Sequence, residues 1–202
     1  MRRELWPIAV IPFLPKAQDQ KCVNRGALLQ PQAASAGAIV RTIFDACWFG
    51  STYGAGEIGL LCSTGGGGSI DGVTLNNCNA ALNAAQGVWL SGSGTQNVQI
   101  TGGFYAGNAS GIVFDAAATG GALVSGSKCG PWGAVGGNNT YGVQMLAGTA
   151  NNFSIVNRDL RGNTVGSIGD ASSGTTARLK INNKGYNPQP AVAITVGASP
   201  FT

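Results

Sequence analysis

The sequence predicts an all-β domain built as a right-handed parallel β-helix, in which each coil of the chain stacks on the coil before it. Two copies of the turn Gly-Asn-x-x-Gly, at residues 107–111 and 162–166, lie 55 residues apart and accompany short strand-like segments. Glycine makes up 33 of the 202 residues, and only 10% of residues are charged. Repeats of roughly 20–50 residues with glycine or asparagine at the corners are typical of stacked solenoid units.

Residues 1–38 are predicted to form an N-terminal arm or cap. The start, MRRELWPIAVIPFLPK, has the basic beginning and apolar run of a secretory signal, but Pro7, Pro12 and Pro15 interrupt that run. No stretch approaches the roughly 20 apolar residues of a membrane-spanning helix, so we expect no membrane span.

Residues 39–185 are predicted to form the β-helix, with about five to six coils of three short strands. The first strands of successive coils are aligned as Ile43-Phe44, Val73-Thr-Leu75, Val98-Gln-Ile100, Leu123-Val124, Phe153-Ser-Ile155 and Leu179-Lys-Ile181. The later strands are aligned as Ile58-Gly-Leu60, Val88-Trp-Leu90, Ile112-Val-Phe114, Val143-Gln-Met145 and Val165–Ile168. In both series a spacing of 24 residues grows to 31 around Gly130–Thr140, which indicates an insertion there.

Alternation within the strands predicts two inward columns of stacked apolar side chains. These columns are Val88/Ile112/Val143 and Leu90/Phe114/Met145. Five asparagines that follow first strands are predicted to occupy left-handed corners and to bond along the stack. They are Asn76, Asn77, Asn157, Asn182 and Asn183.

The five cysteines form no CxxC pair, and their odd number implies no closed disulfide framework. They are Cys22, Cys47, Cys62, Cys78 and Cys129. We interpret them as small buried hydrophobes of a reduced protein. Because Asp45 aligns with Asn76, Cys47 and Cys78 are predicted to be neighbours in adjacent coils.

Residues 186–202 are predicted to be an exit segment. Pro188 and Pro190 stop the last coil, and Ala191–Val196 has the composition of a strand that begins a C-terminal β element.

Taken together, several segments resemble the right-handed parallel β-helices of phage and prophage tail spikes and tail fibres, in the pectate-lyase-like superfamily. They are IDGVTLNNCNAALN (70–83), GVWLSGSGTQNVQITGG (87–103), NRDLRGN (157–163) and NNKGYNPQP (182–190). The resemblance implies a homotrimer of a virion tail or an extracellular, prophage-encoded protein. It also implies a bacterial surface polysaccharide as the ligand, bound in a mainly adhesive and structural role.

The alternative function is that of a polysaccharide lyase or glycoside hydrolase of the same superfamily. Hydrolysis needs two carboxyl groups within roughly 5–9.5 Å, but Asp45, Asp115 and Asp159 align with Asn76, Leu146 and Lys128 rather than with other acids. Asp115 and Asp159 are therefore the catalytic candidates, with turn positions as their competing interpretation. The chain has no histidine, and its 12 basic residues form no stripe, so we expect no metal, no cofactor and no nucleic acid.

Aromatic and amide side chains are the candidates for carbohydrate binding. Trp89 lies between inward Val88 and Leu90 and is predicted to face outward, where it could stack on a sugar or pack against another rod or the N-terminal arm. The other candidates are Tyr105 and Tyr141 at strand edges, and Trp132, Asn138 and Asn139 in the enlarged turn. A simple loop insertion is the competing interpretation of that turn.

Overall fold

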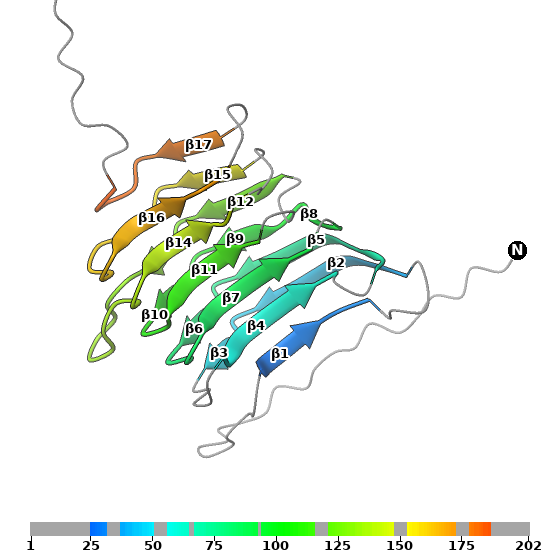
Figure 1. Cartoon of the computed structure of the whole chain (residues 1–202), viewed down its shortest axis with the longest axis horizontal. Coiled ribbons are helices and arrows are strands. Elements are labelled where there is room, and N and C mark those ends of the chain that lie inside the picture. Colours follow the sequence, from blue (N-terminus) through cyan, green and yellow to red (C-terminus); the bar gives the residue numbers. More distant parts are fainter. Residues whose placement is uncertain are drawn as a thin grey trace, which may run out of the picture.

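The computed structural model describes residues 25–31, 37–50, 56–64, 67–92, 94–115, 121–147, 153–172 and 178–186. In these residues the protein is an all-β parallel solenoid without α-helix. The strands lie side by side along one axis, in the order of the sequence (Figure 1). No helix in the described part of the chain has the length and apolarity needed to cross a membrane.

Three parallel sheets run along the solenoid axis. Sheet A contains β1 (Arg25–Leu29), β4 (Ile58–Ser63), β7 (Gln86–Ser91), β11 (Ser110–Phe114), β14 (Tyr141–Met145) and β16 (Gly166–Asp170). Sheet B contains β2 (Ala38–Asp45), β5 (Ser69–Asn76), β9 (Gln99–Thr101), β12 (Ala122–Ser125), β15 (Phe153–Val156) and β17 (Arg178–Ile181), with β8 (Thr95–Gln96) also paired to β5. Sheet C contains β3 (Trp48–Gly50), β6 (Asn79–Ala81), β10 (Phe104–Ala106) and β13 (Lys128–Cys129).

The described residues form about four complete turns, fewer than the five to six coils that the sequence predicts. Each complete turn passes from sheet B through sheet C to sheet A. Beyond β13, sheet C continues only as isolated bridges from Lys128 to Asp159 and from Asp159 to Lys184, so the last turns lack a full third strand. At the other end, β1 lies in the segment predicted as an arm or cap and pairs with β4.

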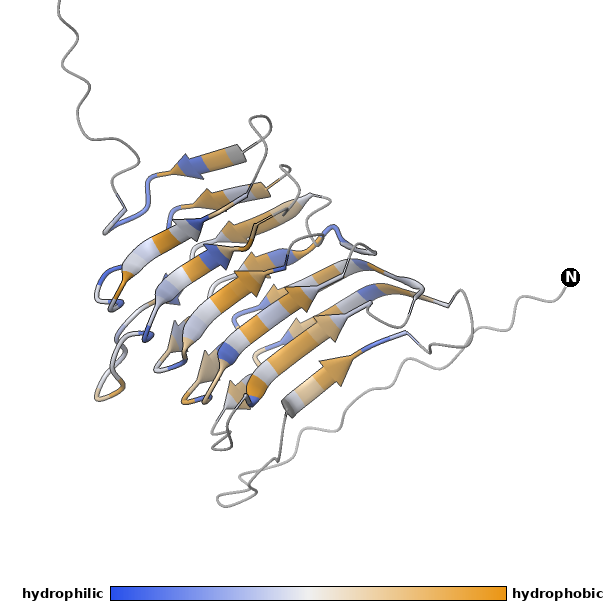
Figure 2. Cartoon of the chain, in the orientation of Figure 1, coloured by the Kyte–Doolittle hydropathy of each residue, from blue (hydrophilic) through white to orange (hydrophobic). Residues whose placement is uncertain are grey.

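The two predicted inward columns are confirmed. Val88 pairs with Ile112 and Ile112 with Val143, while Phe114 pairs with Leu90 and with Met145. All six side chains are fully buried. Hydrophobic residues of β4, β7 and β11 accordingly lie side by side across sheet A (Figure 2).

The predicted register is wrong at the two outer coils. Leu60, not Ile58, pairs with Val88. At the other end Lys180, rather than Ile181, pairs with Ile155. A slip of one residue exchanges the two faces of a strand, so Leu179 and Ile181 are exposed.

The interior position of β17 is instead taken by a charged residue. Lys180 forms an ion pair with Asp170, which pairs in register with the inward Met145. Both side chains of the ion pair are largely buried. The apolar core therefore ends, at the last described turn, in a salt bridge rather than in another aliphatic layer.

The corner between sheets B and C repeats a left-handed residue in every turn. Six successive corners have φ between 48° and 67° at Ala46, Asn77, Gly102, Gly126, Asn157 and Asn182. This confirms the corner role predicted for Asn77, Asn157 and Asn182, and the Asn182 side chain donates to Asn157 Oδ1 at 2.8 Å. Asparagine and glycine tolerate this conformation best.

The corner between sheets C and A contains a buried asparagine ladder, formed by Asn83, Asn108, Asn138 and Asn163. Each Nδ2 of the first three donates to the Oδ1 of the next, at 2.9, 3.1 and 2.8 Å. The two Gly-Asn-x-x-Gly turns supply Asn108 and Asn163, with Asn138 between them. The prediction that these turns lie two coils apart is therefore confirmed.

An inward glycine faces each amide of the asparagine ladder. An added Cβ would come within 2.7–3.0 Å of an Nδ2 of the ladder in each of four successive turns. The pairs are Gly59 with Asn83, Gly87 with Asn108, Gly111 with Asn138, and Gly142 with Asn163. The ladder fits inside the coil because these positions have no side chain.

The cysteines of the described residues are reduced, and most are buried. Cys62, Cys78 and Cys129 have no exposed surface, and none of the four described cysteines forms a disulfide. Burial raises the pKa of Cys62 to about 12 and that of Cys78 to about 11. These thiols stay protonated near neutral pH and pack as hydrophobes, as predicted. Cys22 lies outside the described residues.

Candidate functional site

The outer face of sheet C displays an aromatic strip, formed by Trp48, Phe104 and Trp132. In β3, Phe49 points into the core and Trp48 points outward, with about half of its surface exposed. In β10, Tyr105 points inward and Phe104 outward, by the same alternation. Trp132 comes from the enlarged turn and is 44% exposed.

The three rings form one continuous contact. The Phe104 and Trp132 rings stack, with centroids 3.9 Å apart and an interplanar angle of 10°. Trp48 meets Phe104 edge-on, with centroids 5.5 Å apart. Such contacts hold the rings in a fixed orientation and leave outer surfaces of both tryptophans in solvent.

Asn79 occupies the place in the strip between Trp48 and Phe104. It pairs with Trp48, and its Oδ1 accepts a hydrogen bond from the backbone N–H of Phe104 at 3.0 Å. A small side chain bound to the backbone leaves the space across which Trp48 reaches Phe104. Gly50 supports the same arrangement, because a Cβ there would lie 2.4 Å from the indole nitrogen of Trp48.

The enlarged turn folds back onto sheet C as a small hairpin. Trp132 and Val135 exchange two backbone hydrogen bonds of 2.9 Å. Cys129 still pairs with Tyr105, 24 residues earlier, whereas Asn138 bonds to Asn108, 30 residues earlier. Most of the predicted insertion therefore lies between Cys129 and Asn138, and it places Trp132 on Phe104.

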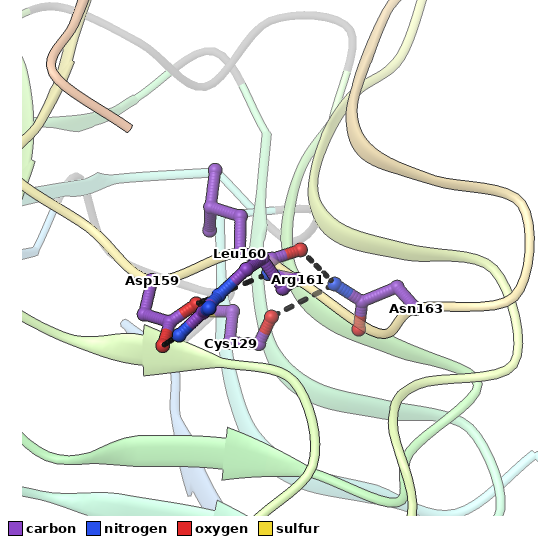
Figure 3. Close-up of polar contacts among 5 residues, drawn as sticks. All are labelled: Cys129, Asp159, Leu160, Arg161 and Asn163. Carbon is purple, nitrogen blue, oxygen red and sulfur yellow. Dashed lines mark hydrogen bonds and ion pairs between the residues drawn. The ribbon is translucent and has the colours of Figure 1, made fainter. Parts of the chain in front are cut away.

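Along the solenoid axis, the aromatic strip continues into a charged end, formed by Lys128, Asp159, Arg161 and Lys184. Lys128 pairs with Phe104, and Asp159 is bridged to Lys128 and Lys184. Arg161 binds both carboxylate oxygens of Asp159, at 2.9 and 2.8 Å (Figure 3). These bonds, together with the charge of Lys128, lower the pKa of Asp159 to about 2.

The same close-up shows how the charged end is joined to the asparagine ladder. Asn163 donates to the backbone carbonyls of Cys129 and Leu160, both at 2.8 Å (Figure 3). Leu160 is fully buried, whereas Arg161 is largely exposed. The turn that presents Arg161 to solvent is therefore anchored to the interior on both sides.

The interior beneath the strip contains one buried cation. Arg158 is 1% exposed, donates from Nη2 to the thiol of Cys129 at 2.6 Å, and has no hydrogen-bond partner at Nε or Nη1. Its guanidinium lies 6.0 Å from the ring centroid of Tyr105, whose hydroxyl also lacks a partner. Burial raises the pKa of the Tyr105 hydroxyl, so this phenol stays neutral and supplies no countercharge.

Trp89 faces outward from β7, as predicted, but it lies on a packed surface. Its neighbours in register, Leu61 and Val113, are both buried, with 8% and 2% of their surfaces exposed. The indole nitrogen of Trp89 is itself buried and has no hydrogen-bond partner. The structure therefore places Trp89 in packing across sheet A rather than on an open surface.

The other predicted carbohydrate-binding residues are dispersed. Tyr105 and Asn138 are fully buried, one in the core and the other in the asparagine ladder. The half-buried ring of Tyr141 covers Gly166 and Gly169 of β16. Asn139 is exposed near the hairpin. Of the predicted set, Trp132 alone belongs to the aromatic strip.

The two catalytic candidates lie on different sheets. Asp115 follows β11 of sheet A, where it accepts a hydrogen bond from the Ser91 hydroxyl at 2.7 Å. Asp159 lies in line with sheet C, between two lysines and bound to Arg161. Among the residues that the structure describes, no group of three or more Cys, Asp or Glu side chains is arranged to hold a metal ion.

Sequence reasoning missed Trp48 and Phe104. Both follow a left-handed corner residue by two positions, Ala46 and Gly102 respectively. Aligning the corners first would have placed the two aromatic residues at one outward position. Comparison with protein-family models, curated proteins and solved structures found no match, so the functional argument depends on this geometry.

Proposed function

We propose that the chain binds an extended polysaccharide along the outer face of sheet C, in an adhesive role without catalysis. The observation that carries this proposal is the exposed aromatic strip, whose rings are fixed in place and aligned with the solenoid axis. Flat, exposed rings suit the apolar faces of sugars, and solenoid faces suit extended ligands. The sequence resemblance to phage tail spikes and tail fibres supports a bacterial surface polysaccharide as the ligand.

The proposal is tested by affinity electrophoresis against a panel of bacterial surface polysaccharides. We expect Trp48→Ala and Trp132→Ala to weaken retention by at least about tenfold, because exposed tryptophans at the centre of an interface dominate binding. Ile43→Ala is the matched control, since it removes an equally exposed apolar side chain from sheet B. Equal retention of all three variants and the parent protein would refute the proposal.

The same panel separates binding from the alternative lyase or hydrolase activity. Binding without release of reducing ends or unsaturated sugars is expected over long incubations. Release of either product, and its loss in Asp159→Ala, would instead assign the face to an enzyme. Asp115→Ala serves as the comparison, because Asp115 follows a strand of sheet A.

A further inference from the structure

Charged side chains follow the aromatic strip on the same face. The outward position of sheet C is occupied in successive turns by Trp48, Asn79, Phe104, Lys128, Asp159 and Lys184. An extended ligand aligned with the axis would meet rings first and charges next. The two halves of this face therefore belong to one continuous surface.

The charged half is cationic in balance. Arg161 and Asp159 neutralise each other through a bidentate ion pair. The ammonium groups of Lys128 and Lys184 make no hydrogen bond or ion pair within the described residues, although Asp159 lies between their positions. Two positive charges in adjacent accessible positions therefore remain for a ligand.

We propose that the ligand of sheet C is an acidic polysaccharide, with sugar rings on the aromatic strip and uronate carboxylates on Lys128 and Lys184. This inference rests on the proposed function and adds the chemical class of the ligand. Lysine suits this role because its ammonium is a flexible point charge, which tolerates variation in carboxylate position along a polymer. The Asp159–Arg161 pair keeps the only carboxylate of this half from capturing both lysines.

The test compares each uronate polymer with the same polymer after chemical reduction of its carboxyl groups. Hyaluronate, alginate and a panel of acidic capsular polysaccharides serve as probes, each in both forms. We expect the acidic form of a bound polymer to bind about three- to tenfold more tightly at low ionic strength, as two partly exposed ion pairs allow. The difference should shrink as salt is raised from about 0.01 to 1 M, because screening acts on the charges alone.

Variants assign the effect to the two lysines. Lys128→Gln with Lys184→Gln should reduce the affinity for the acidic form to that for the reduced form and leave the latter unchanged. Lys180→Gln is unsuitable as a control because Lys180 pairs with Asp170 in the core, so Arg41→Gln, on an exposed position of sheet B, is used. Arg41→Gln should change neither affinity.

The outcomes distinguish this inference from the proposed function. Equal binding of acidic and reduced forms, still abolished by Trp48→Ala, would overturn the acidic class and retain the polysaccharide-binding role. Binding of acidic forms that ignores both tryptophan variants would make the face a general polyanion surface and overturn the proposed function. Retention of no acidic polymer, with neutral polymers retained, would also overturn the inference.

Discussion

Two columns of side chains run along the solenoid axis, the asparagine ladder inside the coils and the aromatic strip outside them. In the ladder, each amide is bonded to the next, and glycines make room for it. In the strip, the rings contact one another but leave outer surfaces in solvent. The comparison teaches that one repeat can serve two purposes: the ladder stabilises the coil, and the strip is available to a ligand.

The largest expected effect comes from breaking the ladder at Asn108. Its Oδ1 accepts from the N–H and Nδ2 of Asn83, and its Nδ2 donates to the carbonyl of Ala80 and to Asn138. Asn108→Ala should lower the free energy of unfolding by roughly 2–5 kcal/mol, because buried polar groups lose their partners. Chemical denaturation measures the loss. The exposed Asn139→Ala is the control, and a similar loss in both variants would contradict the role of the ladder.

A smaller loss is expected when the space for the ladder is filled. A Cβ at Gly111 would lie 2.4 Å from the carbonyl oxygen of Gly142 and 3.0 Å from Nδ2 of Asn138. Gly111→Ala should therefore cost about 1–3 kcal/mol through overpacking. Gly136→Ala is a matched control, since its Cβ would meet no atom within 4 Å. If both variants unfold at the same temperature, the inner glycines do not shape the coil.

A change of the opposite sign is expected at Arg158, which contrasts with the satisfied amides of the ladder. Two of its nitrogen atoms are buried without partners, and the described core offers it a thiol rather than a carboxylate. Arg158→Met should raise the free energy of unfolding by about 1–3 kcal/mol, since a buried charge without a counterion is replaced by an apolar side chain of similar length. Thermal and chemical unfolding measure this, and a clear loss of stability would show that Arg158 contributes to the core.

The smallest effect is expected outside the coil, at the Asp159–Arg161 pair. The folded state lowers the pKa of Asp159 from 3.8 to about 2, so its contribution to stability is present above about pH 4 and is lost as the pH falls toward 2. Asp159→Asn should therefore be slightly less stable than the parent near pH 5, and the difference should vanish near pH 2. Denaturation across this range tests the sign. A difference that grows on acidification would contradict the low pKa.

The sequence predicted the parts of the fold that repeat. Spacing alone placed Val88, Ile112 and Val143 in one buried column, and it located the insertion before Asn138. Prediction failed at the outer coils, because a register is fixed by neighbours on both sides and a terminal strand such as β17 has a neighbour on one side only. It also missed β1, whose place is set by pairing with β4 rather than by a repeat of its own.

The candidate site divides in the same way. Period-two alternation predicted that Trp89 and Trp132 belong to different kinds of segment and that Trp89 faces outward, which the structure confirms. Exposure could not be predicted, because it depends on neighbours in adjacent turns: Leu61 and Val113 pack beside Trp89, whereas Trp48 and Trp132 border the small Asn79 and open solvent.

By itself the sequence determined the solenoid, its corner residues and its insertion, because hydrophobic period, glycine and asparagine act over a few residues and recur in every turn. Only the tertiary structure decided which residues form the asparagine ladder and which form the aromatic strip. Phe104 and Trp132 are 28 positions apart in the chain, and they stack because six turn corners of nearly equal conformation set each coil on the last. Contacts between turns depend on that exact stacking, which no single turn specifies.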